Sequence, residues 1–323
     1  MTAESAFLAA LRPLATDPAA RGLVDDAAVL PAPLGRDLVL THDMLIEGVH
    51  FLPGDPPGDV AWKLLAVNLS DLAAKGARPL GVLMGCGLGA ESAWDDAFVA
   101  GLARALDHFG VALLGGDTVA MPAGAPRALG LTALGEAAPG LAPPRSGARA
   151  GDRLWVSGTI GDAGLGLAIA RGARAGPRRL LKAYRLPMPR LAAGRALAPH
   201  VHAMADVSDG LLLDASRIAR ASGLAVAIDL DAVPLSAEAV AAAGDDRAAR
   251  LAAATAGDDY ELLFAAPEAA SAALLALKPR PGLTPIGRFA PGAGLQVHDA
   301  AGAVPLPARL GFEHRPAESP AMR

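Results

Sequence analysis

The sequence predicts a mixed α/β protein built from two α/β units. Short apolar strand patterns alternate along the chain with segments of helical spacing. A stretch rich in proline and glycine, residues 137–151, interrupts this alternation and is typical of a domain boundary. The chain has 323 residues, enough for two domains of ordinary size. We therefore expect domains at residues 1–137 and 151–323.

The expected elements of the first unit follow from periodicity and from the residues that end each element. Apolar residues at i, i+3 and i+4 indicate helices, and a glycine such as Gly76 or Gly110 closes two of them. The helices are expected from Phe7, over 59–75 and over 92–109, and the strands over 37–41, 79–88, 111–114 and 127–135.

The second unit shows the same alternation after residue 151. The pattern Tyr260–Glu261–Leu262–Leu263–Phe264 indicates a strand because apolar and other residues alternate. The remaining strands are expected over 154–156, 203–207 and 224–230, and helices over 162–171 and 211–221.

Composition excludes several classes of function. The net charge is −4 and the pI is near 6, which disfavours nucleic acid as a partner, because its binding requires basic groups that neutralise phosphates. The single cysteine, Cys86, rules out a disulfide within the chain. No charge-free run of 18 apolar residues predicts a membrane span, and Glu4 stands where a secretory signal would be basic. We expect a cytoplasmic enzyme.

Acidic residues recur after apolar runs, with a small or hydroxyl residue beside most of them. A carboxylate at the carboxyl end of a strand lies at the rim of a sheet, where α/β proteins bind ligands. Each cluster taken singly is explained as readily by a turn, a helix cap or a solvated surface. The clusters are Asp25–Asp26, Thr41–His42–Asp43, Asn68–Leu69–Ser70–Asp71, Gly115–Gly116–Asp117–Thr118 and Asp206–Val207–Ser208–Asp209–Gly210.

As a set, these clusters indicate a magnesium–phosphate site. Asp206 and Asp209 are three residues apart across an expected strand-to-helix turn, so they can face a common point. Carboxylates about 4 Å apart repel by about 4 kcal/mol at an effective dielectric of 20, so several in one cleft require cations or raised pKa values. Oxygen ligands suit Mg²⁺, which bridges carboxylates to phosphates in phosphoryl transfer. The sequence has neither a P-loop nor the protein-kinase motifs, and a Mg²⁺-dependent phosphohydrolase stays open on these grounds.

The order of the motifs resembles one family. D-D-A-A-V-L, T-H-D-M-L-I-E-G-V-H-F, W-K-L-L-A-V-N-L-S-D-L-A-A-K-G-A-R-P, L-L-G-G-D-T, R-S-G-A-R-A-G-D, V-S-D-G-L and G-D-D-Y-E-L follow one another as in the thiamine-monophosphate kinases. The resemblance runs from Asp25 to about His314. It implies membership of the aminoimidazole-ribonucleotide-synthetase-like superfamily.

The resemblance further implies a fold and a reaction. The N-terminal domain would be ferredoxin-like and would pair into a β-barrel across a homodimer, with a C-terminal α/β domain completing the active site. The reaction would transfer a phosphoryl group from ATP directly, in line, to thiamine monophosphate, giving thiamine diphosphate. Neither a nucleic acid nor a membrane is an expected partner.

Roles for individual residues are likewise implied by the resemblance. The catalytic aspartates would be Asp209, Asp206 and Asp117. The Mg²⁺ ligands would be Asp26, Thr41, His42, Asp43, Asp71, Asp117, Asp206 and Asp209. ATP would be held by Gly116, Asp117, Arg145 and Ser208, and thiamine monophosphate by His50, Asp258 and Phe312.

This sequence departs from the family pattern at four places around the expected site. Gly22–Leu23–Val24–Asp25–Asp26 lacks one glycine of the usual pattern, and His42 and Met44 replace hydroxyl residues. Asp258 is one methylene shorter than the usual glutamate, and Phe312 stands where tyrosine or tryptophan is common. Three alternatives remain at this point. They are an aminoimidazole ribonucleotide synthetase-like enzyme, a selenophosphate synthetase, against which the lack of a thiol near the N-terminus weighs, and a non-catalytic nucleotide-binding protein.

Overall fold

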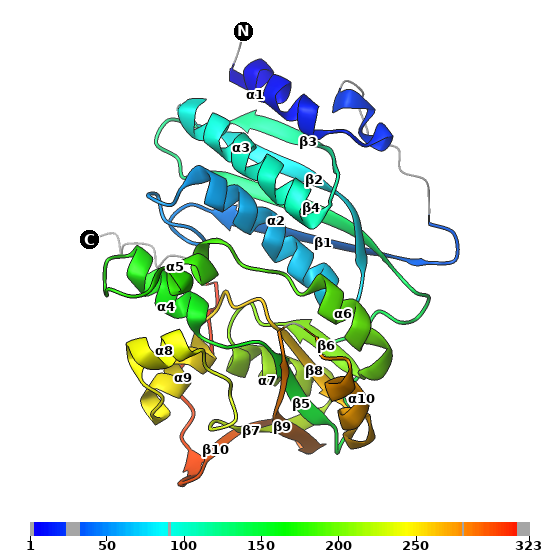
Figure 1. Cartoon of the computed structure of the whole chain (residues 1–323), viewed down its shortest axis with the longest axis vertical. Helices are drawn as coiled ribbons and strands as arrows, with labels where there is room; N and C mark the ends of the chain where they lie inside the picture. Colours follow the sequence, from blue (N-terminus) through cyan, green and yellow to red (C-terminus); the bar gives the residue numbers. More distant parts are fainter. Residues whose placement is uncertain (1–2, 24–32, 90–91, 280, 315–323) are drawn as a thin grey trace, which may run out of the picture.

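The computed structural model describes residues 3–23, 33–89, 92–279 and 281–314. These residues fold into two α/β units that lie one above the other in Figure 1. The first unit reaches to the end of strand β4 at Ala137, and the second begins with strand β5 at Arg153. The mixed α/β class predicted from the periodicity is confirmed.

The first unit is a sheet with helices on one face. Its described strands lie in the order β1–β4–β2–β3, in which β2 and β3 are parallel and the other neighbours antiparallel. The elements are α1 (Ala3–Leu11), the short helices η1 (Arg12–Leu14) and η2 (Pro18–Leu23), β1 (Asp37–Ile46), α2 (Pro57–Ala74), β2 (Arg78–Leu88), α3 (Ser92–Phe109), β3 (Leu113–Ala120) and β4 (Ala128–Ala137).

The connectivity of this unit corrects one expectation. A ferredoxin-like domain has the order βαββαβ, whereas here the order is βαβαββ. The difference arises because α3 leads from β2 into the parallel neighbour β3, and β4 then returns to lie between β1 and β2. Among the described residues the sheet is open and forms no closed barrel, with β1 at one edge and β3 at the other.

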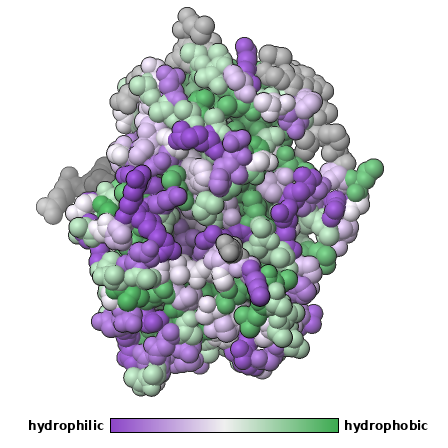
Figure 2. Space-filling model, in the orientation of Figure 1, coloured by the Kyte–Doolittle hydropathy of each residue, from purple (hydrophilic) through white to green (hydrophobic). Residues whose placement is uncertain are grey.

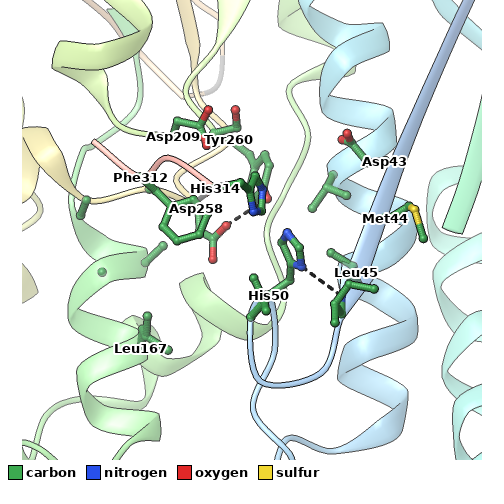
Figure 3. A pocket seen from close by; sticks show the side chains of 18 of the residues that line it. Asp43, Met44, Leu45, His50, Leu167, Asp209, Asp258, Tyr260, Phe312 and His314 are labelled. Atoms are coloured by element: carbon green, nitrogen blue, oxygen red, sulfur yellow. Dashed lines mark hydrogen bonds between the residues drawn. The ribbon is translucent and has the colours of Figure 1, made fainter. Parts of the chain in front are cut away.

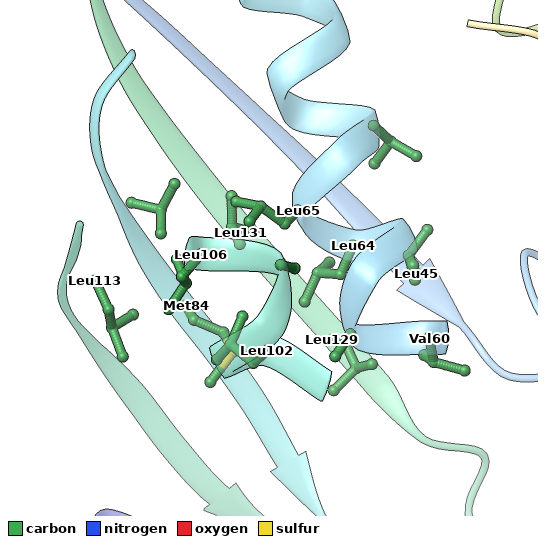
Figure 4. Close-up of a cluster of buried hydrophobic side chains, with 14 of the residues drawn as sticks. Leu45, Val60, Leu64, Leu65, Met84, Leu102, Leu106, Leu113, Leu129 and Leu131 are labelled. Carbon is green, nitrogen blue, oxygen red and sulfur yellow. The ribbon is translucent and has the colours of Figure 1, made fainter. Parts of the chain in front are cut away.

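Helices α2 and α3 cover one face of this sheet and form its core. Leucines from both helices pack onto the inward side chains of β2 and β4, as Figure 4 shows. Leu64 and Leu102 are fully buried there against Met84 and Leu131. Alternation along β1 turns Leu45 into this core and sends Leu38 and Leu40 to the opposite face, where both side chains are exposed among the described residues.

The second unit is built around a mixed sheet. Its described strands lie in the order β11–β10–β7–β9–β5–β8–β6. Its strands are β5 (Arg153–Ser157), β6 (Ala203–Asp206), β7 (Leu224–Asp229), β8 (Leu262–Ala266), β9 (Leu283–Pro291), β10 (Gly294–Asp299) and β11 (Gly302–Val304). Its helices are α4 (Asp162–Ala170), α5 (Arg178–Arg185), α6 (Leu191–Leu197), η3 (Ala198–His200), α7 (Leu211–Ala221), α8 (Ala237–Ala243), α9 (Arg247–Thr255), η4 (Glu268–Ala270) and α10 (Ser271–Ala276).

Most of the expected strands differ by one or two residues from the observed bounds, and the differences in three strands bear on the site. β1 and β3 continue past the expected ends, so Asp43 and Asp117 lie inside strands and not beyond them. β8 begins at Leu262, because Asp258 and Tyr260 adopt positive φ angles of 70° and 50° that no strand residue has. Within the described ranges, no helix is long and apolar enough to cross a bilayer.

Helix α2 joins the two units. It contacts β1, β2 and β4 of its own sheet and also α5, α6 and β6 of the second unit. Its approach to α6 is close, since a Cβ on Gly194 would lie 1.9 Å from the carbonyl oxygen of Ala73. Only glycine leaves room for this contact, and the two units depend on it for their packing.

We therefore expect Gly194→Ala to destabilise the protein by about 2 kcal/mol through overpacking. Alanine is favoured over glycine in a helix by about 1 kcal/mol, so a net loss has to come from the contact with Ala73. Urea unfolding measures the change. Gly54→Ala is the matched control, because nothing lies within 4 Å of a Cβ at Gly54. Equal free energies of unfolding for the two variants would contradict the close contact between Gly194 and Ala73.

Candidate active site

Carboxylates from both units meet where α2 contacts β1 and β6. The hydroxyl of Thr41 on β1 donates a hydrogen bond to Oδ2 of Asp71 on α2. The hydroxyl of Ser70 donates to Oδ2 of Asp206 at the end of β6, at 2.6 Å. Because successive helix residues point about 100° apart, Ser70 reaches the second unit while Asp71 faces β1.

The neighbouring residue Asn68 fixes the strand on the other side. Its side-chain Oδ1 accepts a hydrogen bond from the backbone N–H of Asp43 at 2.9 Å, and its Nδ2 donates to the carbonyl of Leu64 at 3.0 Å. Asn68 and Ser70 are fully buried. The motif N-L-S-D on one helix thus holds Asp43 in place, orients Asp206 and supplies a carboxylate of its own.

The environment of these carboxylates disfavours their charged forms. Burial raises the pKa of Asp43 to about 6, and the charges of Asp71 and Asp209 add to the effect. Burial raises the pKa of Asp206 to about 8, Asp71 adds repulsion, and the hydrogen bond from Ser70 opposes both. The site therefore gathers more negative charge than its own groups can stabilise.

The loop after β6 presents Asp209 and is braced by α7. The guanidinium of Arg217 pairs with Asp209 and, at 2.8 Å, with Asp214. The backbone N–H of Asp209 donates to Oδ2 of Asp214 at 3.1 Å. Burial, followed by the charge of Asp209, raises the pKa of Asp214 to about 6. Asp214 and Arg217 thus hold the turn that carries Asp209.

Two cations lie at the carboxyl end of α2. The ammonium of Lys75 donates to the carbonyls of Pro143 and Met204, each at 3.0 Å. Burial, and then the charge of Arg145, lowers the pKa of Lys75. The predicted ATP ligand Arg145 therefore lies beside Lys75 and not in the cavity described next.

A cavity of about 800 Å³ opens between the two units. In Figure 2, hydrophilic side chains border a hollow at the middle height of the molecule. Figure 3 shows the cavity from close by, with Asp43 on β1 at one side and Asp209 and Phe312 at the other. His50 and Asp258, which were predicted to bind the substrate, line it as well. The structure thus brings all three predicted substrate residues together.

The carboxyl-terminal segment forms part of this cavity. The backbone N–H of Phe312 donates to the carbonyl of Asp209 at 2.8 Å. A Cβ on Gly311 would lie 2.3 Å from that carbonyl, so only glycine allows the segment to approach the loop. The ring of His314 lies 5.1 Å from that of His50 and meets Phe312 edge to face at 4.9 Å. Burial, with the charge of His314, lowers the pKa of His50.

Two predicted residues lie on the opposite face of the first sheet. Because side chains alternate along a strand, His42 points away from Thr41 and Asp43, and its Nδ1 lies 2.9 Å from Oγ1 of Thr132. Asp117 pairs in register with Gly85 and lines, with His42 and Gly116, a second cavity of about 620 Å³. The imidazole of His42 and the carboxylate of Asp117 are therefore separated from the cluster at α2.

The remaining predictions are distributed as follows. Ser208 lines the 800 Å³ cavity, and its carbonyl accepts the backbone N–H of Asp258 at 2.8 Å. Asp26 lies outside the described residues.

The donor set is chemically suited to Mg²⁺. Thr41, Asp43, Asp71, Asp206 and Asp209 offer only hydroxyl and carboxylate oxygens, and burial, with repulsion from neighbouring carboxylates, raises the pKa values of Asp43 and Asp206. In the described part of the chain, no three His, Cys, Asp or Glu side chains converge on one point. Such a spread fits an ion that keeps waters and bridges to phosphates better than one in an all-protein cage.

Several contributors were missed in the sequence. Asn68, Lys75, Tyr260 and His314 were not assigned a role, although the first two lie inside the most specific motif. Tyr260 lines the cavity and donates from its hydroxyl to Oδ1 of Asp258 at 3.0 Å. Tyr260 lies in an alternating apolar pattern that indicates a strand, and this pattern concealed its role. His314 stands two residues after Phe312, and this spacing of an imidazole and an aromatic ring was a signal that could have been used.

Two domain models and many relatives match this chain. The model of the N-terminal domain of AIR synthase related proteins matches residues 24–137, and that of the C-terminal domain matches residues 149–300. A thiamine-monophosphate kinase of Caulobacter vibrioides is 43% identical over 313 residues, covering 94% of this chain and 88% of the relative.

Solved structures agree with these relatives. Thiamine-monophosphate kinase from Stenotrophomonas maltophilia superposes with a TM-score of 0.80 at 39% identity, covering 94% of this chain and 97% of that one. The structure of AaThiL complexed with AMPPCP and TMP superposes with a TM-score of 0.73 at 31% identity, covering 84% and 87% of the two chains.

The raised pKa values predict how stability depends on pH. A carboxylate whose pKa is about 8 when folded and 3.8 otherwise binds more protons in the folded state. Its contribution to stability is full below pH 3.8 and is lost as pH rises toward 8. In EDTA we expect the free energy of unfolding to fall by roughly 3 to 4 kcal/mol between pH 5 and pH 8. Asp206→Asn should flatten this profile, as urea titrations at each pH would measure. An unchanged slope in that variant would contradict the assignment.

Proposed function

We infer that this chain, which belongs to the AIR synthase related family and within it to the thiamine-monophosphate kinases, phosphorylates thiamine monophosphate with ATP. The terminal P–O bond of ATP breaks, and a new P–O bond forms to a phosphate oxygen of thiamine monophosphate, giving ADP and thiamine diphosphate. The curated relatives with this activity reach 43% identity and cover 94% of the chain. An aminoimidazole ribonucleotide synthetase-like activity is not favoured by these relatives.

One observation in the structure supports this reaction most directly. The acidic cluster at α2 adjoins a cavity of about 800 Å³ whose walls come from both units. Asp43 and Asp209 belong to the cluster and also line the cavity. A substrate in the cavity thus has its reacting phosphate next to groups suited to metal-bound phosphates.

The roles of the substrate-binding residues remain our proposal. Phe312 offers an aromatic face to the rings of thiamine, with a cation–π attraction for the thiazolium. Asp258 and His50 face the same cavity from opposite units. AaThiL has been solved with both AMPPCP and TMP, and we propose that this chain binds ATP and thiamine monophosphate at corresponding places. Arg145, Ser208 and Gly116 are the proposed ATP contacts, with Asp117.

We propose that Mg²⁺ ions are held by Asp26, Thr41, His42, Asp43, Asp71, Asp117, Asp206 and Asp209. His42 would contribute its backbone carbonyl, because its imidazole faces the other side of the sheet. When bound, Mg²⁺ neutralises phosphate charge and polarises the leaving group. The protein's own part is to orient both substrates and to exclude water, so no general base is required.

The direct test incubates the pure protein with Mg-ATP and thiamine monophosphate and detects thiamine diphosphate by chromatography. Formation of thiamine diphosphate with one ADP per product is the expected result. ADP formed equally fast without thiamine monophosphate, and no diphosphate product, would refute the proposed reaction.

Among single substitutions, Asp209→Asn should reduce turnover at least about 100-fold, since it removes charge but little volume at the proposed transfer site. The fold should survive, because Arg217 keeps its partner Asp214 at 2.8 Å. Initial rates measure the loss, and circular dichroism measures the fold. Near-normal turnover would show that Asp209 holds no metal.

We also propose a homodimer formed through the face of the first sheet that is opposite to α2 and α3. Large apolar side chains lie exposed there, with Leu38 at 47%, Leu40 at 59% and Val119 at 54%. These side chains lie on both edge strands of one sheet face, and large exposed apolar surfaces are typical of protein–protein contacts. Pairing of two such sheets face to face is the β-barrel expected for the family.

Leu40→Glu should shift the protein toward monomers, because a carboxylate would be buried in that interface. Leu275→Glu on α10 is the matched control, since Leu275 is 55% exposed and lies in the other unit. Light scattering after size-exclusion chromatography gives the mass of each variant. A dimeric Leu40→Glu variant would place the interface elsewhere.

A further inference from the structure

We propose that Lys63 is a positioning residue that sets the affinity for thiamine monophosphate. It holds together the two walls of the 800 Å³ cavity, which we call the acceptor cavity because thiamine monophosphate accepts the phosphoryl group there. Lys63 lies on α2 in the first unit and pairs with Asp258 in the second. The inference rests on the proposed function of the cavity. Lys63 is not among the described residues that line the cavity, and the inference gives it a role in substrate binding.

The ammonium of Lys63 is buried and has three partners within contact distance. Its side chain is 2% exposed, which is rare for a lysine and requires a partner for each charge and donor. It donates to Oδ2 of Asp258 at 2.7 Å and to the carbonyl of His50 at 2.9 Å. It also lies 4.3 Å from the centre of the Tyr184 ring, within the range of a cation–π contact. The ammonium, which has three N–H donors, thus contacts three partners.

These partners belong to three separate segments. His50 is in the loop between β1 and α2, Asp258 precedes β8, and Tyr184 is on α5. Tyr184 is itself fixed, because its hydroxyl donates to Oδ2 of Asp55 at 2.7 Å. The ammonium is therefore the common contact of the loop that carries His50 and the loop that carries Asp258.

Asp258 needs such a contact to hold its position. Its φ of 70° lies in the left-handed region, which is unfavourable for a residue with a side chain. Its carboxylate receives Lys63 on Oδ2 and the Tyr260 hydroxyl on Oδ1, and it keeps 32% of its side chain exposed toward the cavity. With both oxygens anchored, the carboxylate meets the substrate in one orientation.

The acidic cluster, which is the proposed magnesium site, is served by a different part of α2. Asn68, Ser70 and Asp71 serve the cluster, whereas Lys63 is one to two turns nearer the amino end of the helix. Loss of Lys63 should therefore weaken the binding of thiamine monophosphate and leave the binding of Mg-ATP intact. A merely structural residue would affect both substrates through the stability of the whole fold.

The test replaces Lys63 with methionine, which keeps length and apolar bulk. We expect KM for thiamine monophosphate to rise about 10- to 100-fold, with KM for ATP within about threefold of wild type and kcat reduced less than about fivefold. Calorimetric titration with thiamine monophosphate in the presence of AMPPCP should show the same loss of affinity without turnover. An unchanged affinity for thiamine monophosphate, or an equal loss for both substrates, would overturn the proposal.

Trp62→Phe is the matched control. The indole N–H of Trp62 donates to the carbonyl of Pro187 at 2.9 Å, so it crosses the same boundary from the adjacent helix position without contacting Asp258 or His50. This variant should keep wild-type KM values. If it weakens acceptor binding as much as Lys63→Met does, any contact across the boundary suffices, and the specific role of Lys63 fails.

A double-mutant cycle keeps the proposal testable if Lys63→Met does not fold. Asp258→Asn and the double variant Lys63→Met/Asp258→Asn complete the cycle, and the double variant leaves neither charge of the pair uncompensated. Acceptor affinity in the double variant should equal that of Asp258→Asn within about twofold. Further weakening beyond that would show that Lys63 acts independently of Asp258. A wild-type protein that forms no thiamine diphosphate would refute the proposed function and not this pairing, which the binding titration with AMPPCP tests separately.

Discussion

The placement of helix α2 between two sheets is the constraint on which the rest of the structure depends. Most helices at a protein surface bury one stripe and leave the opposite side to water. In α2 the leucines Leu64, Leu65, Leu69 and Leu72 are fully buried, and so are the polar residues Asn68 and Ser70. A buried polar side chain is costly unless it forms hydrogen bonds, so each of these has to meet a partner in β1, β6 or the helix itself. The hydrogen-bond partners that the buried polar side chains of α2 require therefore fix how the two units pack against each other.

That requirement also brings the carboxylates together. Asp43 on β1 and Asp206 at the end of β6 come near Asp71 because α2, which carries Asp71, contacts both strands. Burial, followed by repulsion between carboxylates, raises the pKa values of Asp43 and Asp206 and makes the site unfavourable without cations. Natural proteins accept such local cost at functional sites, because the same low-dielectric surroundings strengthen the binding of metal-bound phosphates. The carboxylates that lower the stability of the boundary between the units are thus the same groups that we propose bind metal-bound phosphates.

The acceptor cavity is held by contacts of a different kind. Phe312 is attached to the loop of Asp209 through its backbone, and Asp258 is attached to the first unit through Lys63. The lining of the cavity comes from both units, so a substrate that fills the cavity contacts both units at once. Movement of one unit against the other would change the distance between a substrate in the cavity and the acidic cluster at α2, and the in-line transfer that we propose depends on that alignment.

Residues whose roles depend on local pattern could be predicted from the sequence. Periodicity predicted α3 and α7 with the observed bounds, and the acidic motifs predicted a magnesium–phosphate site before any family was considered. The position of each aspartate along the chain was visible, and so was the stretch between the units. The order of the motifs then indicated the family, which the relatives confirm. These inferences succeed because a helix, a strand or a motif is written in residues that are neighbours in sequence.

Only the tertiary structure decided which of these residues meet. It separated His42 and Asp117 from Thr41 and Asp43, since the pleat of a strand sends adjacent side chains to opposite faces. It set the strand order of the first sheet, in which β4 returns between β1 and β2. It also paired Lys63 with Asp258, 195 positions away. Such pairings depend on how α2 is shared between two sheets, and no local pattern records which distant segment will satisfy a buried charge. The sequence by itself therefore determined the chemistry that is present, and the packing of α2 decided where that chemistry is assembled.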